Sequence, residues 1–352
     1  MTLRAPVLDG GEDLAVQIER LRVTYPRWQR IVDEIGQCHA VAPLAAEPPC
    51  LLLVGPTGAG KSTLVASYAQ QYPPLLTEAG RTQPVVRATI PVPATIKALA
   101  TTLLAALGDP RATSGTVGSL TYRLTHFIQD CGVELLILDE LQHFRDRDNR
   151  KVLENASNWL KTLIKETGVA CVLVGLQGEA EEVVQLNAQL ARLFGAPHVL
   201  APFAWDERRS ETIHEFLAFL TLLEGALPLA ERPELATPGM AARLHAASGG
   251  IMAYLMELIR RATYLALAQE RPTVDSPLPL LSGEGFILCS DGCEEEALLE
   301  LGRAVIMDEF ALFPLSGAPA APLGLVIAGN TLAHATNQNA IQPDTTAPSS
   351  VR

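Results

Sequence analysis

The sequence predicts an α/β fold, in which a five-stranded parallel sheet carries helices on both faces and is followed by a C-terminal helical lid. Short apolar runs alternate with amphipathic stretches over the first two-thirds of the chain. A glycine-rich loop separates the first apolar run from the next helix. From about residue 205 the strand-like runs stop, and helical stretches follow one another. Strands that alternate with helices are typical of a parallel sheet covered on both faces.

The expected strands are short and mostly apolar, as strands buried on both faces of a sheet are. The first, CLLLVG, ends in the glycine-rich loop, and the third, ELLILDEL, carries two acidic residues near its end. We expect the strands at residues 50–55, 85–92, 134–141, 169–177 and 197–203.

The expected helices have apolar residues at helical spacing, and several of them stop at a glycine. Gly108, Gly132 and Gly168 each follow the last periodic residue of such a stretch. We expect helices at residues 25–40, 61–72, 95–109, 119–132, 150–168 and 179–195, and three more in the lid at 206–228, 237–250 and 251–270.

These patterns divide the chain into four parts. Residues 1–48 form a helical lead-in, 49–204 the α/β core, 205–271 the helical lid and 272–352 a C-terminal extension. The end of the extension is rich in Ala, Pro, Gly, Thr and Asn, which predicts a largely irregular or disordered segment. No internal repeat is visible.

Composition limits the classes of function. A net charge of −12 argues against a generally basic nucleic-acid coat protein. An acidic chain can still carry a local basic strip. No apolar run reaches the roughly 18 residues of a membrane span, and no signal peptide is visible, so we expect a cytoplasmic protein with unpaired thiols. Cys289 and Cys293 lack a second pair or nearby His residues, which is not typical of structural zinc.

The stretch GPTGAGKS, from Gly55 to Ser62, matches the phosphate-binding loop, or P-loop, G-x-x-x-x-G-K-[ST] between a strand and a helix. Backbone N–H groups of such a loop and of the following helix bind phosphate oxygens. Lys61 is expected to reach the β- and γ-phosphates, and Ser62 to ligate Mg²⁺. The expected nucleotide-binding residues are Gly55, Pro56, Thr57, Gly58, Ala59, Gly60, Lys61, Ser62 and Thr63.

Asp139 and Glu140 close the apolar run LLIL and are the expected second half of the site. An aspartate at the end of a neighbouring strand holds Mg²⁺, and the following glutamate polarises the attacking water as a general base. The alternative is a solvated acidic turn. The pair favours hydrolysis, and the lack of any N-K-x-D motif favours ATP over GTP.

Two further residues are catalytic candidates. Gln177 ends the fourth expected strand and is placed to orient the water, or it is an ordinary polar strand end. Arg192 lies at the end of the helix before the fifth strand. It is either an arginine finger for the ATP site of a neighbouring subunit or a cation that stabilises its helix terminus.

Hydroxyl-bearing and basic residues occur between the second and third expected strands, in an otherwise acidic chain. They are candidates for contacts to DNA phosphates, and the alternative is a solvated helix face and loop. The four main candidates are Thr95, Lys97, Thr121 and Arg123, and the set also includes Arg111, Thr113, Ser114 and Thr116.

Taken together, GPTGAGKS, LLILDE, VGLQ, ARLF and the helical module resemble the AAA+ ATPases. The flanking phrases YPRWQRIVDEI and APFAWDE are similar to the TniB family, the transposition ATPases related to TnsC proteins. The resemblance covers residues 20–265. It departs from the usual AAA+ pattern after Gly249 and Gly250, where an arginine often follows soon, because here Arg260 and Arg261 come late.

The resemblance implies ATP-dependent assembly into rings or filaments on duplex DNA, and the hydroxyl-bearing and basic insert predicts binding without a sequence preference. The resemblance also implies recruitment of a transposase, often with a TniQ-type adaptor, and disassembly by hydrolysis. Two alternatives remain open. One is another AAA+ DNA machine, such as a helicase loader or a replication initiator, although no helix-turn-helix is visible. The other is a signalling NTPase of the STAND type, although such proteins usually carry repeat arrays.

Overall fold

The computed structural model describes residues 11–268, apart from 79, 145–149 and 230, together with 279–282 and 285–288. The chain divides into two units, Met1–Glu309 and Phe310–Arg352, and every described residue belongs to the first. The predicted irregular end of the chain lies outside the described residues, as do Cys289 and Cys293.

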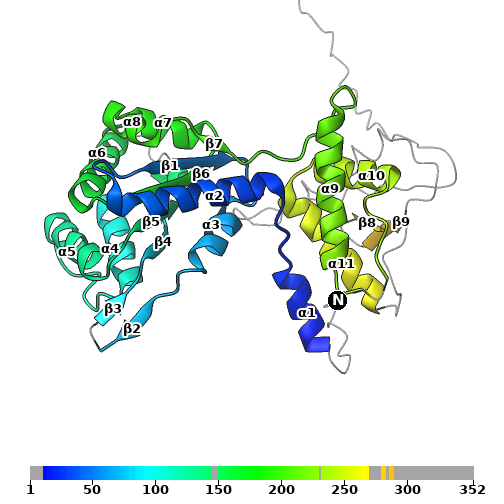
Figure 1. Cartoon of the computed structure of the whole chain (residues 1–352), viewed down its shortest axis with the longest axis horizontal. Coiled ribbons are helices and arrows are strands. Elements are labelled where there is room, and N and C mark those ends of the chain that lie inside the picture. Colours follow the sequence, from blue (N-terminus) through cyan, green and yellow to red (C-terminus); the bar gives the residue numbers. More distant parts are fainter. Residues whose placement is uncertain are drawn as a thin grey trace, which may run out of the picture. The chain divides into compact units, whose positions relative to one another are not determined.

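The central sheet has five parallel strands in the order β4-β5-β6-β1-β7, which confirms the predicted fold class (Figure 1). Leu53 of β1, the strand next to the edge strand β7, pairs with Val174 of β6 on one side and with His198 of β7 on the other. The strands are β1 (Cys50–Gly55), β4 (Val85–Thr89), β5 (Leu135–Asp139), β6 (Ala170–Leu176) and β7 (His198–Val199).

Strand β7 is shorter than the seven-residue strand predicted at 197–203. Proline has no N–H to donate to a neighbouring strand, and Pro197 and Pro202 flank the paired residues. Only one further bond, from Leu200 N–H to the Val54 carbonyl at 2.8 Å, extends the pairing. The chain then leaves the sheet for the lid.

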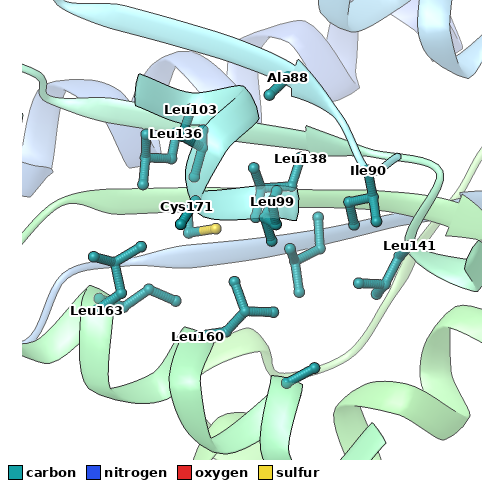
Figure 2. Packing of buried hydrophobic residues seen from close by; sticks show 14 of the residues in the cluster. Ala88, Ile90, Leu99, Leu103, Leu136, Leu138, Leu141, Leu160, Leu163 and Cys171 are labelled. Carbon is teal, nitrogen blue, oxygen red and sulfur yellow. The ribbon is translucent and has the colours of Figure 1, made fainter. Parts of the chain in front are cut away.

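The strands bury both faces, with alternate residues on opposite sides. In β5, Leu136 and Leu138 contribute to one buried cluster, whereas Leu135 and Ile137 contribute to another. Figure 2 shows the first cluster, where leucines of α4 (Ile96–Leu107) and α6 (Arg150–Thr167) surround Leu136 and Leu138. The second cluster packs α2 (Pro26–Val41) and α3 (Lys61–Ala69) on the other face.

The predicted helix at 179–195 is wrong as one element, because the structure has two helices there, α7 (Glu179–Gln185) and α8 (Ala188–Phe194). Asn187 separates them. Its side-chain oxygen accepts hydrogen bonds from the N–H groups of Gln189 and Leu190, at 2.9 and 3.1 Å. Asparagine is among the preferred N-cap residues, so it starts a new helix in the middle of the amphipathic pattern.

The helix α5 (Val117–Asp130) agrees closely with its prediction. The strand expected to reach residue 141 ends at Asp139, because the 3₁₀ helix η2 begins just after β5.

Several elements were not predicted. The additional elements are α1 (Gly11–Arg20), η1 (Ala42–Leu44), β2 (Leu75–Thr77), β3 (Gly80–Thr82), η2 (Leu141–Phe144), β8 (Pro279–Ser282) and β9 (Gly285–Leu288).

The helical lid consists of α9 (Ser210–Ala226), α10 (Pro238–Ser248) and α11 (Met252–Ala268). Its core includes Phe216, Phe219 and Leu244, and Tyr25 from the lead-in packs edge-on against Phe219 with ring centroids 5.4 Å apart. No helix in the described part of the chain is both long and apolar enough to cross a bilayer.

Candidate nucleotide-binding site

Three neighbouring strands end beside one another at the candidate site. β1 ends at Gly55, β5 at Asp139 and β6 at Leu176, and Gly55 is paired with Leu176. Because the strands are parallel, their carboxyl ends share one edge of the sheet, where ligands bind in folds of this kind. Gln177 follows β6, and its N–H lies 3.4 Å from the Gly55 carbonyl oxygen. The structure therefore brings the P-loop, the acidic pair and Gln177 together.

The P-loop depends on glycine at specific positions. Gly58 and Gly60 have φ values of 77° and 96°, a left-handed region in which a side chain is strained. At Gly55 a Cβ would lie 2.3 Å from the Leu200 carbonyl oxygen, so only glycine fits there. The loop leads directly into α3, whose first residue is Lys61. A helix N-terminus that follows a glycine-rich loop favours phosphate binding.

Lys61 lies inside this loop with only 9% of its surface exposed. Its ammonium group donates hydrogen bonds to the carbonyl oxygens of Gly55 and Pro56, each at 2.8 Å. Burial lowers the pKa of Lys61, and the negative charges of Glu140 and Asp139 partly counteract this effect. The lysine and the two acids thus interact electrostatically, as expected for the parts of one site.

Asp139 is buried at the end of β5, with 2% of its surface exposed. Its Oδ1 accepts the N–H of Glu140 at 3.0 Å, and its Oδ2 accepts a hydrogen bond from Arg87 at 3.2 Å. The sequence reasoning missed Arg87. A signal was available, because a charged residue in the middle of an apolar strand, VVRAT, requires a buried partner.

Glu140 has a φ of 64°, and no other non-glycine residue in the described part of the chain has a positive φ. Such a conformation is strained for an L-residue, and strained residues cluster at active sites and ligand-binding sites. The side chain is 38% exposed and accepts a hydrogen bond from Gln142, while His143 Nε2 lies 3.9 Å from the same carboxylate oxygen, Oε2.

The oxygen atoms of Ser62 and Asp139 are suitable donors for Mg²⁺. This ion prefers oxygen ligands, keeps several waters, and is usually held by one or two carboxylates together with substrate phosphates. Among the described residues no group of three or more His, Cys, Asp or Glu could form a metal cage. The hydroxyl of Ser62 and the carboxylate of Asp139 fit an ion of this kind, held in part by nucleotide phosphates.

The lid touches the P-loop directly. The N–H of Ala253, near the start of α11, donates a 2.9 Å hydrogen bond to the Gly58 carbonyl. A Cβ on Gly58 would lie 3.0 Å from side-chain atoms of Ile251 and Ala253. Apolar residues make this contact, and Arg260 and Arg261 follow about two turns further along α11.

Arg192 lies apart from the other candidates. Its guanidinium donates to both carboxylate oxygens of Glu47, each at 2.9 Å, and its side chain is 73% exposed. Glu47 precedes the first residue of β1, at the edge of the sheet opposite the P-loop. Arg192 is thus remote from the P-loop of its own chain.

The DNA candidates fall into two groups. Lys97 and Arg111 are exposed, as are the loop residues Thr113, Ser114 and Thr116. Thr95, Thr121 and Arg123 have internal partners: Thr95 caps α4 through the N–H of Ala98, and Thr121 accepts the indole N–H of Trp159 at 2.9 Å. Arg123 donates to the Asp109 carboxylate and to the carbonyls of Arg111 and Ser114, which holds the loop between α4 and α5.

Comparison with solved structures supports the fold. The Aeropyrum pernix ORC1 protein in complex with DNA is 16% identical, with a TM-score of 0.54 over 86% of this chain and 72% of that chain. Cdc6p from Pyrobaculum aerophilum is 14% identical, with a TM-score of 0.53 over 74% of this chain and 67% of that chain. The Aeropyrum pernix ORC2 protein in its ADPNP-ADP complexes is 15% identical, with a TM-score of 0.51 over 82% of this chain and 71% of that chain. No curated protein matched the sequence.

A phosphate loop on β1, an Asp-Glu pair on β5 and a helical lid after β7 define a P-loop ATPase of the AAA+ class. Within that class, the profile of the family described as "Bacterial TniB protein" matches residues 14–204, more than half of the 352 residues. The chain belongs to the TniB family.

Proposed function

We propose that this protein is an ATP-dependent, DNA-binding regulator of transposition. It assembles on duplex DNA in its ATP-bound form, recruits a transposase together with a TniQ-type adaptor, and is released when ATP is hydrolysed. The observation that carries this proposal is that the P-loop after β1 and the pair Asp139–Glu140 at the end of β5 lie at the carboxyl ends of the two strands that flank β6. The negative charges of Glu140 and Asp139 there partly counteract the lowering of the Lys61 pKa by burial. Membership in the TniB family supports the role in transposition.

In this proposal each part of the site has one role. Lys61 and the N–H groups of the P-loop bind the phosphates. Ser62 and Asp139 hold Mg²⁺, which supplies charge neutralisation on the phosphate oxygens. Glu140 accepts a proton from the attacking water, and Gln177 orients that water.

Arg192 is proposed to act on a neighbouring subunit. Its partner Glu47 precedes β1, whereas the P-loop follows β1, so the two groups belong to opposite edges of the sheet. A guanidinium at that edge is suited to a phosphate held by a second copy of the chain. A contact of this head-to-tail kind generates rings or filaments.

DNA binding is proposed for exposed residues at the start of α4 and in the loop between α4 and α5. Lys97 and Arg111 supply the charges, and exposed hydroxyls supply further contacts to phosphates. Thr95, Thr121 and Arg123 then contribute by ordering these elements: Thr95 caps α4, and Arg123 holds the loop. Because each subunit offers few cations, strong binding requires many subunits on one duplex.

The nucleotide roles can be tested with two variants. Lys61→Ala removes the charge that reaches the phosphates, so ATP binding and ATP-dependent assembly should be lost. Glu140→Gln keeps the shape but loses the base, so it should bind ATP normally and hydrolyse it about a hundredfold more slowly. Nucleotide affinity and turnover, measured on both variants, check these roles. Unchanged affinity in the first or unchanged turnover in the second would contradict them.

DNA binding should be compared with and without ATP on two unrelated duplexes. Affinity should require ATP, fall as salt rises, and be nearly equal for both sequences. Lys97→Ala should weaken binding to both duplexes alike. Lys165→Ala is the matched control, since Lys165 is exposed near the end of α6 and precedes β6, at the other edge of the sheet. Tight binding without nucleotide, or preference for one duplex, would instead favour an initiator.

A further inference from the structure

Gln142 occupies a buried position between Glu140 and the end of β6. Only 8% of its surface is exposed, although glutamine is usually a surface residue. Its Nε2 donates to the Oε2 of Glu140, and its Oε1 accepts the N–H of Leu176 at 3.1 Å. Both ends of the amide are therefore in use, one on the proposed base and the other on the backbone of a neighbouring strand.

The direction of these two bonds is determined by their chemistry. The Leu176 N–H can only donate, so the amide oxygen of Gln142 must face it. The amide nitrogen then has to face the carboxylate of Glu140, to which it donates. The backbone of β6 thus fixes the orientation of the amide, and the amide contacts the acid.

The strand leaves space for this contact only because residue 175 is glycine. A Cβ on Gly175 would lie 3.1 Å from the Gln142 Oε1 and 2.8 Å from the Cβ of Ala180. It would also lie 3.2 Å from the Cβ of Leu141. The close approach of η2 to β6 is therefore a built feature of the fold.

We propose that Gln142 is a positioning residue, which holds the Glu140 carboxylate in the orientation needed to accept the proton from water. This inference rests on the proposed function of Glu140. A glutamate side chain has several rotamers of similar energy, and a misplaced base is a poor base. The strained backbone of Glu140 and the hydrogen bond from Gln142 together restrict the carboxylate to one of them.

The bond network also extends to the P-loop. Gln177 follows Leu176 directly, and its N–H lies 3.4 Å from the Gly55 carbonyl, which also accepts from Lys61. The end of β6 therefore contacts both the amide that holds Glu140 and the carbonyl that holds Lys61. Gln142 is the member of this network whose removal should affect the base without touching the phosphate-binding groups.

Two variants of Gln142 separate positioning from simple packing. Gln142→Met removes both hydrogen bonds at similar volume. Gln142→Glu keeps an oxygen that can accept the N–H of Leu176. It replaces the NH₂ group that donates to Glu140 with a carboxylate oxygen, which cannot donate. Both should lower kcat about tenfold, the usual effect of losing one hydrogen bond to a charged group, and leave the KM for ATP and the ATP affinity within about twofold.

The matched control is Gln83→Met. Gln83 is also 8% exposed, and its amide oxygen accepts from Arg81 away from the site. It should lose thermal stability comparably to Gln142→Met but keep the parental kcat. A second check is the double variant with Glu140→Gln, in which Gln142→Met should cause no further loss of kcat, because its effect acts through Glu140.

The kcat values of these variants show whether Gln142 positions Glu140. A lower kcat in both Gln142 variants, absent in the Glu140→Gln background, supports positioning. A loss only in Gln142→Met would mean that the residue acts through β6, and a parental kcat in both would mean that it only packs; either overturns the inference while the proposed function stands. If Glu140→Gln itself hydrolyses ATP at the parental rate, the proposed role of Glu140 fails, and the inference fails with it.

Discussion

Gly249 and Gly250 form the turn between α10 and α11, and they differ in one respect. Both have left-handed φ values, 58° and 68°. A Cβ on Gly250 would lie 2.0 Å from the Phe203 carbonyl oxygen, whereas nothing lies within 4 Å of a Cβ on Gly249. The same carbonyl accepts a 2.9 Å hydrogen bond from His245 Nε2, and burial lowers the pKa of His245. Gly250 therefore allows the lid to contact the segment that leaves the sheet.

We expect Gly250→Ala to destabilise the protein much more than Gly249→Ala does. The Gly249 change costs about 1 kcal/mol from its left-handed backbone alone. The Gly250 change adds a clash with a backbone carbonyl that cannot rotate away, so its melting temperature should fall further. Thermal unfolding of the two variants, followed by circular dichroism, tests this. Equal losses would contradict the close approach.

Residues that act through a continuous motif were predictable, and those that act across strands were not. The phosphate loop and the pair Asp139–Glu140 could be recognised because their spacing along the chain determines their geometry. Arg87 lies on β4 and bonds to Asp139 on β5, and Gln142 connects Glu140 to Leu176 on β6. Which strands are neighbours depends on the order of the sheet, so the contacts became visible only in the structure.

Thr95, one of the candidates for DNA contact, is the N-cap residue of helix α4. Its hydroxyl accepts the N–H of Ala98 at 3.0 Å, and Gly108, in a left-handed conformation, caps the other end of the helix. Such a cap satisfies one of the N–H groups that a helix leaves free. The cap also positions Lys97 in the first turn of the helix.

Thr95→Ala should therefore lower the free energy of unfolding by about 1 kcal/mol, and Thr95→Ser should retain most of that stability because serine also caps. Denaturant unfolding of the three proteins tests the cap. If serine is as destabilising as alanine, the hydroxyl does not stabilise the helix. Comparing their DNA affinities at low denaturant then separates a direct phosphate contact from an effect on α4.

At the level of elements, apolar runs and apolar periodicity identified the elements that form the core, but not a break within a continuous pattern or an element outside the core. All five strands of the sheet were predicted, because each is an apolar run between turn residues. The hairpin of β2 and β3 was missed, since it adds no residue to the core: Leu75 and Leu76 are 59% and 85% exposed. The break at Asn187 was missed because the apolar pattern continues through it.

The whole molecule carries the two halves of its proposed ATP site on different edges of the sheet. We propose residues 49–204 as the core and 205–271 as the lid, and the N–H of Ala253 in the lid donates a hydrogen bond to the Gly58 carbonyl in the core. The P-loop face holds everything expected to bind nucleotide, and Arg192 with Glu47 belongs to the other edge. An isolated chain would then bind ATP but hydrolyse it slowly, and turnover would rise with protein concentration.

Mixing two inactive variants tests this arrangement. An Arg192→Ala chain keeps its P-loop, and a Lys61→Ala chain keeps its arginine. In an equal mixture, roughly a quarter of head-to-tail interfaces should pair an intact P-loop with an intact arginine, so some ATP hydrolysis should return. The Lys61→Ala chain needs no nucleotide of its own for this, because it contributes only the opposite face.

The control replaces the Lys61→Ala chain with one that carries both changes, which leaves every interface without a working pair. Restoration in the first mixture and none in the second supports action between subunits. If Arg192 instead served its own chain, or only stabilised α8 through Glu47, the first mixture would be no more active than its components. The melting temperature of Arg192→Ala shows whether this variant is folded. If it is folded, a mixture without ATPase activity reports on the arginine and not on unfolded protein.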